Sequence, residues 1–204
     1  MAHGPEPGTI LNESGVPTVP RQAATVIVLR GGSERLEILL VQRTPKAKFM
    51  GGAWVFPGGA VDAHEGDGDA AHRAAAIREV AEETGIVLPD PAALVPFARW
   101  ITPPEVTIRF DTYFFLAEAP DGAEVTVDGQ EIVDARWFEP ARALEGSEAG
   151  ELLMVFPTIK NLERIAQFDT AHALLEWAAA HEVKPVEPRV EGQGEAARIV
   201  IDDE

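Results

Sequence analysis

Residues 78–86 read REVAEETGI and end an alanine-rich stretch that predicts an α-helix over Asp69–Thr84. With roughly 100° of rotation per residue, this helix has an apolar stripe centred on Ile77. The other members of the stripe are Ala70, Ala74, Ala81 and Thr84. Three glutamates lie together on the opposite side, at positions 79, 82 and 83. The stretch therefore predicts a helix with one apolar side and one densely acidic side.

The acidic side of this helix is unfavourable for stability. Carboxylates three or four residues apart repel one another by about 0.2–0.5 kcal/mol per pair. They also lie in the last turn, just before Gly85, where the helix dipole disfavours anions. One interpretation is a solvated acidic face in an acidic protein. The other is a metal site, because a cation would stabilise three crowded carboxylates, and oxygen ligands without nearby His or Cys suit Mg²⁺ or Mn²⁺.

Two residues upstream of the helix extend this pattern. Gly59-x5-Glu65 followed by residues 78–86 resembles the Nudix box, G-x5-E-x7-R-E-U-x-E-E-x-G-U, where U is a bulky aliphatic residue. The second half matches at every specified position, but twelve residues instead of seven separate Glu65 from Arg78. An insertion of this size costs a loop only about 0.5 kcal/mol. Gly66–Asp69, which contain only Gly and Asp, are expected to form an exposed loop.

The resemblance to the Nudix family implies an α/β fold, an α/β/α sandwich around a mixed sheet. It implies metal ligands at Gly58, through its backbone carbonyl, and at Glu79, Glu82 and Glu83. In the family the residue matching Glu82 binds metal or orients water, and the matching Arg78 holds a glutamate in place. The general base varies among members and is sometimes a downstream loop glutamate. Glu131 is the candidate here, and the alternative is an ordinary exposed acid before a strand.

Residues 39–59, LLVQRTPKAKFMGGAWVFPGG, resemble a longer signature of coenzyme A diphosphatases within the family, L-L-T-x-R-(S/A)-x3-R-x3-G-x3-F-P-G-G. Every spacing holds, and the departures are Val41, Thr44 and Lys48. Lys48 replaces an arginine, which loses bidentate geometry but keeps the positive charge. With Arg43 and Lys46 it forms a basic patch where a substrate phosphate could dock. The alternative is that Arg43 only ends a strand and the lysines keep a loop solvated.

Aromatic residues and one further arginine complete the candidate substrate-binding set. Trp54 and Phe56 belong to the G-x-W-x-F-P-G-G segment that many Nudix proteins share. Residues 100–104, WITPP, and 109–115, RFDTYFF, look like the branch that includes peroxisomal coenzyme A diphosphatases, which is known for insertions in the box. Arg109 is the candidate from this segment. Trp100 and Phe115 are expected in the core or the pocket wall rather than stacked on a base.

The composition limits the classes of binding partner and the cellular location that we expect for the protein. Seventeen basic against 34 acidic residues give a net charge of −17, which would repel nucleic acids and anionic membranes. The expected partner is therefore a small nucleotide-type substrate, and a homodimer stays open as the oligomeric state. The chain has no cysteine, no apolar run long enough for a membrane span and no signal-peptide pattern. We expect a soluble, cytoplasmic protein.

The rest of the chain predicts one Nudix domain over residues 21–182, after a flexible arm at 1–20 and before a polar tail at 183–204. Strands are expected at Ala24–Arg30, Leu36–Gln42, Val106–Ala117 and Ala135–Phe138, the first two as a pair. Helices are expected after Pro140 and after N-caps at Thr158 and Asp169-Thr170. The residues expected to point inward in the last two helices are Leu162, Ile165, Ala166, Ala171, Leu174, Leu175 and Ala178.

Together, these features predict metal-dependent hydrolysis of a phosphoanhydride. The leading substrate is coenzyme A or an acyl-CoA, cleaved to adenosine 3′,5′-bisphosphate and (acyl-)phosphopantetheine. One alternative is an ADP-ribose or NADH diphosphatase. Another is a non-catalytic, ligand-sensing Nudix domain, against which the presence of Glu79, Glu82 and Glu83 argues.

Overall fold

The computed structural model describes residues 11–12, 14–47, 50–192 and 198–201. A mixed eight-stranded sheet has the order β3-β2-β1-β6-β5-β8, with β4 also paired to β1 and β7 to β2. Its strands are β1 (Arg21–Arg30), β2 (Glu37–Arg43), β3 (Trp54–Val55), β4 (Gly58–Ala60), β5 (Val95–Ile101), β6 (Phe110–Glu118), β7 (Ile132–Phe138) and β8 (Pro185–Val186). The antiparallel strands β9 (Arg189–Glu191) and β10 (Arg198–Val200) form a second, small sheet.

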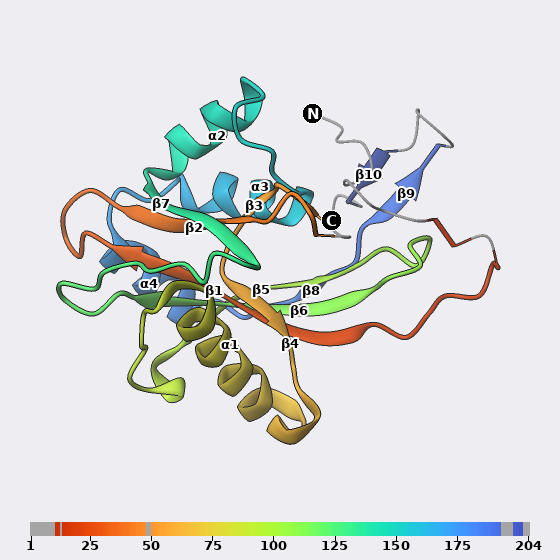
Figure 1. The fold of residues 1–204 in the computed structure, drawn as a ribbon, viewed down its shortest axis with the longest axis horizontal. Helices are drawn as coiled ribbons and strands as arrows, with labels where there is room; N and C mark the ends of the chain where they lie inside the picture. Colours follow the sequence, from red (N-terminus) through yellow and green to blue (C-terminus); the bar gives the residue numbers. More distant parts are fainter. Residues whose placement is uncertain (1–10, 13, 48–49, 193–197, 202–204) are drawn as a thin grey trace.

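Helices cover both faces of the large sheet (Figure 1). They are α1 (Gly68–Thr84), α2 (Pro140–Glu148), α3 (Phe156–Ile165) and α4 (Ala171–Ala179), with short 3-10 helices η1 (Ala63–Glu65) and η2 (Pro91–Ala93). Val26 and Val28 of β1 pack in one apolar cluster with Val80 of α1. Ile27 and Leu29 pack in the other with residues of α3 and α4. Because both faces of β1 are covered, its sequence is almost continuously apolar, and the predicted α/β/α sandwich is confirmed.

Several predicted elements agree with the structure. Strands β1 and β2 pair antiparallel, with Leu29 opposite Ile38. Helix α1 begins one residue before the predicted start, and α2 begins at Pro140. Thr170 caps α4, because its side chain accepts a hydrogen bond from the Ala173 N–H at 3.2 Å. Within the described ranges, no helix is long and apolar enough to span a membrane.

Other predictions were wrong at particular residues. Strand β6 starts at Phe110 instead of Val106, because the chain turns at Pro103, where the Val106 N–H donates to the Pro103 carbonyl at 3.1 Å. Helix α3 starts at Phe156 with Val155 as its N-cap, and Thr158 is a buried helical residue. Pro157 suits this first turn, where its missing N–H is not needed. Ala166 follows α3 and is exposed.

Strand β5 was not predicted. It carries Pro96 and has a register shift between Pro96 and Ala98, which breaks the regular alternation that identifies a strand. Part of the expected C-terminal tail is also built into the fold. Strand β8 pairs parallel with β5 at the sheet edge, and β9 and β10 follow it.

The face of α1 that packs on the sheet differs from the predicted stripe. Ala70 and Ala74 are exposed and Ile77 is only partly buried. The buried side is instead formed by Ala71, His72, Ala75, Ala76, Val80, Glu83 and Thr84. Small alanines let the helix approach the sheet closely, so the acidic side turns partly inward. This rotation places two of the three glutamates against strand β4.

Candidate active site

The Gly58-Gly59 pair of β4 lies between β1 and helix α1. Gly58 pairs with Thr25, and Gly59 pairs with Ala24. A Cβ atom at Gly58 would lie 2.7 Å from Thr25 Cα, and one at Gly59 would lie 2.3 Å from a carboxylate oxygen of Glu79. Only glycine therefore allows the strand and the acidic helix to come this close.

Glu83 is the most buried of the three glutamates, with 5% of its surface exposed. Its Oε2 accepts a hydrogen bond from the Gly58 N–H at 3.0 Å. Burial raises the pKa of Glu83 to about 8; the negative charges of Glu79 and Glu131 add to the rise, whereas the Gly58 N–H and Arg43 oppose it. A buried carboxylate with a raised pKa needs a nearby positive charge to stabilise its ionised form.

Arg78 holds the other acidic groups in position. Its guanidinium donates to Glu65 at 3.0 Å, to Glu79 at 2.8 Å and to Glu82 at 3.1 Å, and also to the Ala60 carbonyl at 3.1 Å. Burial raises the pKa of Glu79 above its ordinary value, although Arg78 opposes this rise. Glu65 therefore serves as the glutamate paired with the box arginine, despite the insertion.

The insertion is exposed, as expected from its composition. Only Gly66 and Asp67 lie outside regular structure, because α1 already begins at Gly68. Asp69 belongs to the first turn of the helix and accepts a hydrogen bond from Arg73 at 2.6 Å. The expected loop over Gly66–Asp69 is therefore wrong at Gly68 and Asp69, which form the start of α1.

Glu131 and Arg43 join this site from the opposite side. The Arg43 guanidinium donates to Glu131 Oε1 at 3.2 Å, and the Thr44 N–H donates to the Glu131 carbonyl at 2.8 Å. A register shift between Gln42 and Arg43, where β2 pairs with β7, aims the arginine at this loop. The Nε of Arg43 is buried and has no hydrogen-bond partner among the residues that the structure describes. This donor is therefore left unsatisfied there.

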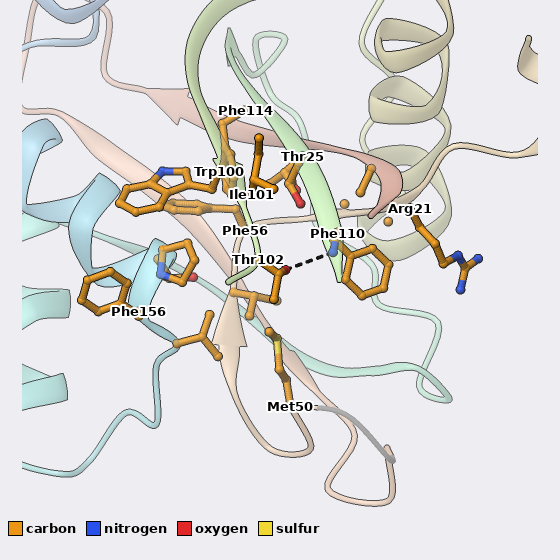
Figure 2. Close-up of a pocket in the computed structure, with 18 of the residues that line it drawn as sticks. Arg21, Thr25, Met50, Phe56, Trp100, Ile101, Thr102, Phe110, Phe114 and Phe156 are labelled. Atoms are coloured by element: carbon orange, nitrogen blue, oxygen red, sulfur yellow. Dashed lines mark hydrogen bonds between the residues drawn. The ribbon is translucent and has the colours of Figure 1, made fainter. Parts of the chain in front are cut away.

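One pocket, with a volume of about 360 Å³, is lined by some of these groups, and Figure 2 shows part of its wall. Arg78, Glu82 and Glu83 are not among its lining residues. Gly58, Gly59, Glu79, Arg43 and Glu131 line its polar part. Most of the remaining lining is apolar and includes Met50, Phe56, Trp100, Phe110, Phe114, Phe156, Val190 and Ile199. Figure 2 also shows the Phe110 N–H donating to the Thr102 hydroxyl, a bond of 3.0 Å at the pocket wall.

The structure does not bring every candidate residue to this pocket. Trp54 is a core residue, packed edge-on against Phe138 with ring centroids 5.6 Å apart. Phe115 is buried in the cluster beneath α1. Arg109 is buried away from the pocket lining, and all its guanidinium nitrogens make hydrogen bonds. Lys48 lies outside the described residues.

Sequence reasoning missed several pocket residues. Thr158, Pro188, Val190 and Ile199 line the cavity, although the first was expected as a helix cap and the others in a polar tail. The apolar run Ile199-Val200-Ile201 was the available signal of a buried segment near the C-terminus. No local sequence pattern indicated that this run would lie in the same pocket as residues of the acidic helix.

The donors around the acidic helix are suited to a hard cation. Glu79, Glu83 and the Gly58 backbone offer oxygen ligands only, which Mg²⁺ and Mn²⁺ prefer. Among the described residues, no three acidic, His or Cys side chains already form a compact metal cluster. Arg78 occupies part of the coordination space of Glu79 and Glu82, and Glu82 is directed to an exposed position. The donor chemistry therefore fits such an ion.

A mixed-sheet α/β/α sandwich with an acidic helix packed on a glycine pair defines a Nudix-type fold and site. The sequence model of the NUDIX domain matches residues 19–158, and the chain belongs to this family. Nudix hydrolases cleave pyrophosphate bonds in nucleoside diphosphate derivatives, and they generally use divalent cations.

Individual relatives agree with this assignment. "Putative nudix hydrolase 7" of Caenorhabditis elegans is 26% identical over 72% of this chain, and the chain spans 61% of that protein's length. "Acyl-coenzyme A diphosphatase NUDT19" of Homo sapiens is 24% identical, with 72% of this chain and 69% of that protein covered. The crystal structure of a NUDIX hydrolase from Alicyclobacillus acidocaldarius has a TM-score of 0.70 and 28% identity, covering 78% of this chain and 96% of that one.

Proposed function

We propose that this Nudix hydrolase cleaves the diphosphate of coenzyme A or an acyl-CoA, using Mg²⁺ or Mn²⁺. One water is added across the P–O–P link, and the products are adenosine 3′,5′-bisphosphate and (acyl-)phosphopantetheine. The observation that carries the proposal is a single pocket that joins acidic and basic groups to a mostly apolar lining. A diphosphate flanked by an apolar group matches both parts.

The proposed roles of the polar residues are those that the resemblance to the family implies. Glu79, Glu83 and the Gly58 carbonyl would hold the cation, with Glu82 contributing to metal binding or to the orientation of water. When bound, such a cation stabilises negative charge on the diphosphate and makes water more acidic. Arg78 orients Glu79 through their 2.8 Å bond. Glu131 would accept the proton of the attacking water.

Arg43 is proposed to bind a phosphate of the substrate. Its position in the pocket lining supports this role, as does its buried Nε, which has no partner in the described part of the chain. A charge-assisted hydrogen bond contributes roughly 1.5–3 kcal/mol, so Arg43→Gln should lower kcat/KM about 10–100-fold. The same substitution would disturb the bond to Glu131, and Glu131→Gln therefore serves as the companion variant.

A substrate panel tests this proposal. We expect turnover of coenzyme A, acetyl-CoA or a long-chain acyl-CoA to exceed that of ADP-ribose, NADH and diadenosine polyphosphates with Mg²⁺, the products being resolved by chromatography. Preference for ADP-ribose or NADH would overturn the coenzyme A assignment. The assignment of a diphosphatase activity would remain. No turnover of any compound with Mg²⁺ or Mn²⁺ would favour the non-catalytic alternative. The cytoplasmic location and a homodimeric state stay predictions.

A further inference from the structure

The C-terminal segment contributes a wall to the pocket. Pro188, Val190 and Ile199, which we name the C-terminal wall, all line the cavity. Val190 and Ile199 are register partners in the β9–β10 pair, so their branched side chains lie side by side. Pro188 and Ile199 are buried and Val190 is partly buried. The wall therefore adds a continuous aliphatic surface to the site of the acidic helix.

Specific contacts hold this wall in place. Strand β8 brings the chain along β5, and Glu187 then forms an ion pair with Arg109. Arg109 also donates to the Thr102 carbonyl at 2.9 Å and to the Thr18 carbonyl at 2.8 Å, so it connects three segments. Its side chain is only 6% exposed. A desolvated arginine with these partners is a strong anchor for the residues that follow Glu187.

A second contact joins the C-terminal wall to a neighbouring loop. The Val190 N–H donates to a carboxylate oxygen of Glu105 at 3.4 Å. Glu105 precedes Val106, which also lines the pocket. The wall is thus attached to the 102–106 loop on one side and to Arg109 on the other.

The chemistry of the wall favours an uncharged occupant without hydrogen-bonding groups. Val190 and Ile199 offer no polar side-chain atom, and an unpaired polar group buried against them would lose its hydration. They also offer no flat ring for a nucleobase. Trp100 and Phe156 already pack edge-to-face on each other, with ring centroids 6.0 Å apart, instead of leaving a parallel slot. The surface fits an aliphatic chain.

We propose that Val190 and Ile199 determine specificity by packing against an uncharged aliphatic group of the substrate, and that Arg109 is the positioning residue for this wall through Glu187. The inference rests on the proposed function, because it names the part of an acyl-CoA that the pocket selects. It adds that selection depends on the C-terminal segment, beyond the matched NUDIX domain at residues 19–158. Arg109 thereby acts through the wall and not by direct contact with the substrate.

Kinetics with substrates of increasing acyl length test the wall. For Val190→Trp, which fills the cavity, the ratio of kcat/KM for dodecanoyl-CoA to that for coenzyme A should fall at least about tenfold. For Ile199→Ala, which enlarges it, the optimum should move to longer chains. Ile201→Ala is the matched control, because this isoleucine lies two residues further on, is 37% exposed and is absent from the lining. Unchanged ratios in both wall variants would overturn the proposal.

The ion pair between Arg109 and Glu187 can be tested separately. Glu187→Gln removes the charge that faces Arg109, so the KM for dodecanoyl-CoA should rise severalfold more than its kcat falls. A merely structural role would instead lower the activity on all substrates in parallel. Equal effects on coenzyme A and dodecanoyl-CoA would therefore contradict the positioning role of Arg109.

A binding assay without turnover separates this inference from the proposed function. The neutral fluorescent probe N-phenyl-1-naphthylamine, in the presence of EDTA, should bind the wild type and Ile201→Ala equally and Val190→Trp at least about tenfold more weakly. This pattern would support the wall even if no coenzyme A species is cleaved. Equal binding by all three proteins, or displacement of the probe by AMP, would overturn it even if coenzyme A is a substrate.

Discussion

Arg78 and Glu65 are joined by two hydrogen bonds, of 3.0 and 3.3 Å, although twelve residues separate them. Glu65 also accepts a hydrogen bond from the Asp62 N–H at 2.7 Å, which fixes its carboxylate from the loop side. The same arginine donates to Glu79. Arg78 therefore connects the Glu65 loop to the acidic helix despite the insertion between them.

Shortening the insertion should leave the domain stable. Gly66 and Asp67 are exposed, and the Asp67 side chain makes no capping hydrogen bond to α1. Deletion of both should change the free energy of unfolding by about 0.5 kcal/mol or less, measured by urea denaturation. By comparison, Glu65→Gln should lower kcat about tenfold, because Arg78 loses its charged partner. A deletion variant that unfolds would show that the loop is packed.

The buried carboxyl of Glu83 predicts an unusual pH dependence of stability. Its pKa rises from an ordinary value near 4.5 to about 8 in the folded protein, so folding favours the protonated form. The contribution of this carboxyl group to the free energy of unfolding is fully present below about pH 4.5. It is lost as the pH rises through 8. In EDTA, the stability of Glu83→Gln relative to wild type should therefore increase between pH 5 and 8.5. A difference that is independent of pH, in urea denaturation, would contradict this environment.

Metal affinity should depend on the inward glutamates. Glu79→Gln and Glu83→Gln should each weaken Mg²⁺ or Mn²⁺ binding strongly in calorimetric titrations, because a neutral amide is a poorer ligand for a hard cation. Glu82→Gln should have a smaller effect, since its side chain is 60% exposed. Glu148→Gln, at the exposed end of α2, is the control. Equal affinity in all four variants would remove the metal assignment.

Glu131→Gln tests the general base. We expect lower turnover near neutral pH and a flatter acid limb of the pH–rate profile, because the amide cannot accept a proton. Metal affinity should change little. An unaltered profile would return Glu131 to the role of a surface acid that only pairs with Arg43.

The sequence predicted the sandwich and the residues of the acidic helix because both depend on local patterns. An almost continuous apolar run identifies β1, and the spacing of Arg78, Glu79, Glu82 and Glu83 identifies the box. The buried face of α1 was assigned wrongly because alanine occurs on both sides of this helix, so its apolar pattern has no clear direction. Glu83 is buried against that pattern, and only Gly58 and Gly59 on the facing strand make room for it.

The C-terminal wall depends on contacts that are distant in sequence. Arg109 and Glu187 are 78 residues apart, and their pairing has no local signature. Arg109 was expected to bind substrate because residues 109–115 look like the branch of the family that includes peroxisomal coenzyme A diphosphatases. Its three backbone and side-chain acceptors in the fold give it a different role.

The most direct test of the account is the conversion of coenzyme A by wild type and Glu79→Gln with Mg²⁺, followed by chromatography. We predict adenosine 3′,5′-bisphosphate and phosphopantetheine in equal amounts from the wild type, and at least about a 100-fold lower rate from the folded variant. Coenzyme A that stays intact with the wild type, or a Glu79→Gln variant with full activity, would contradict it.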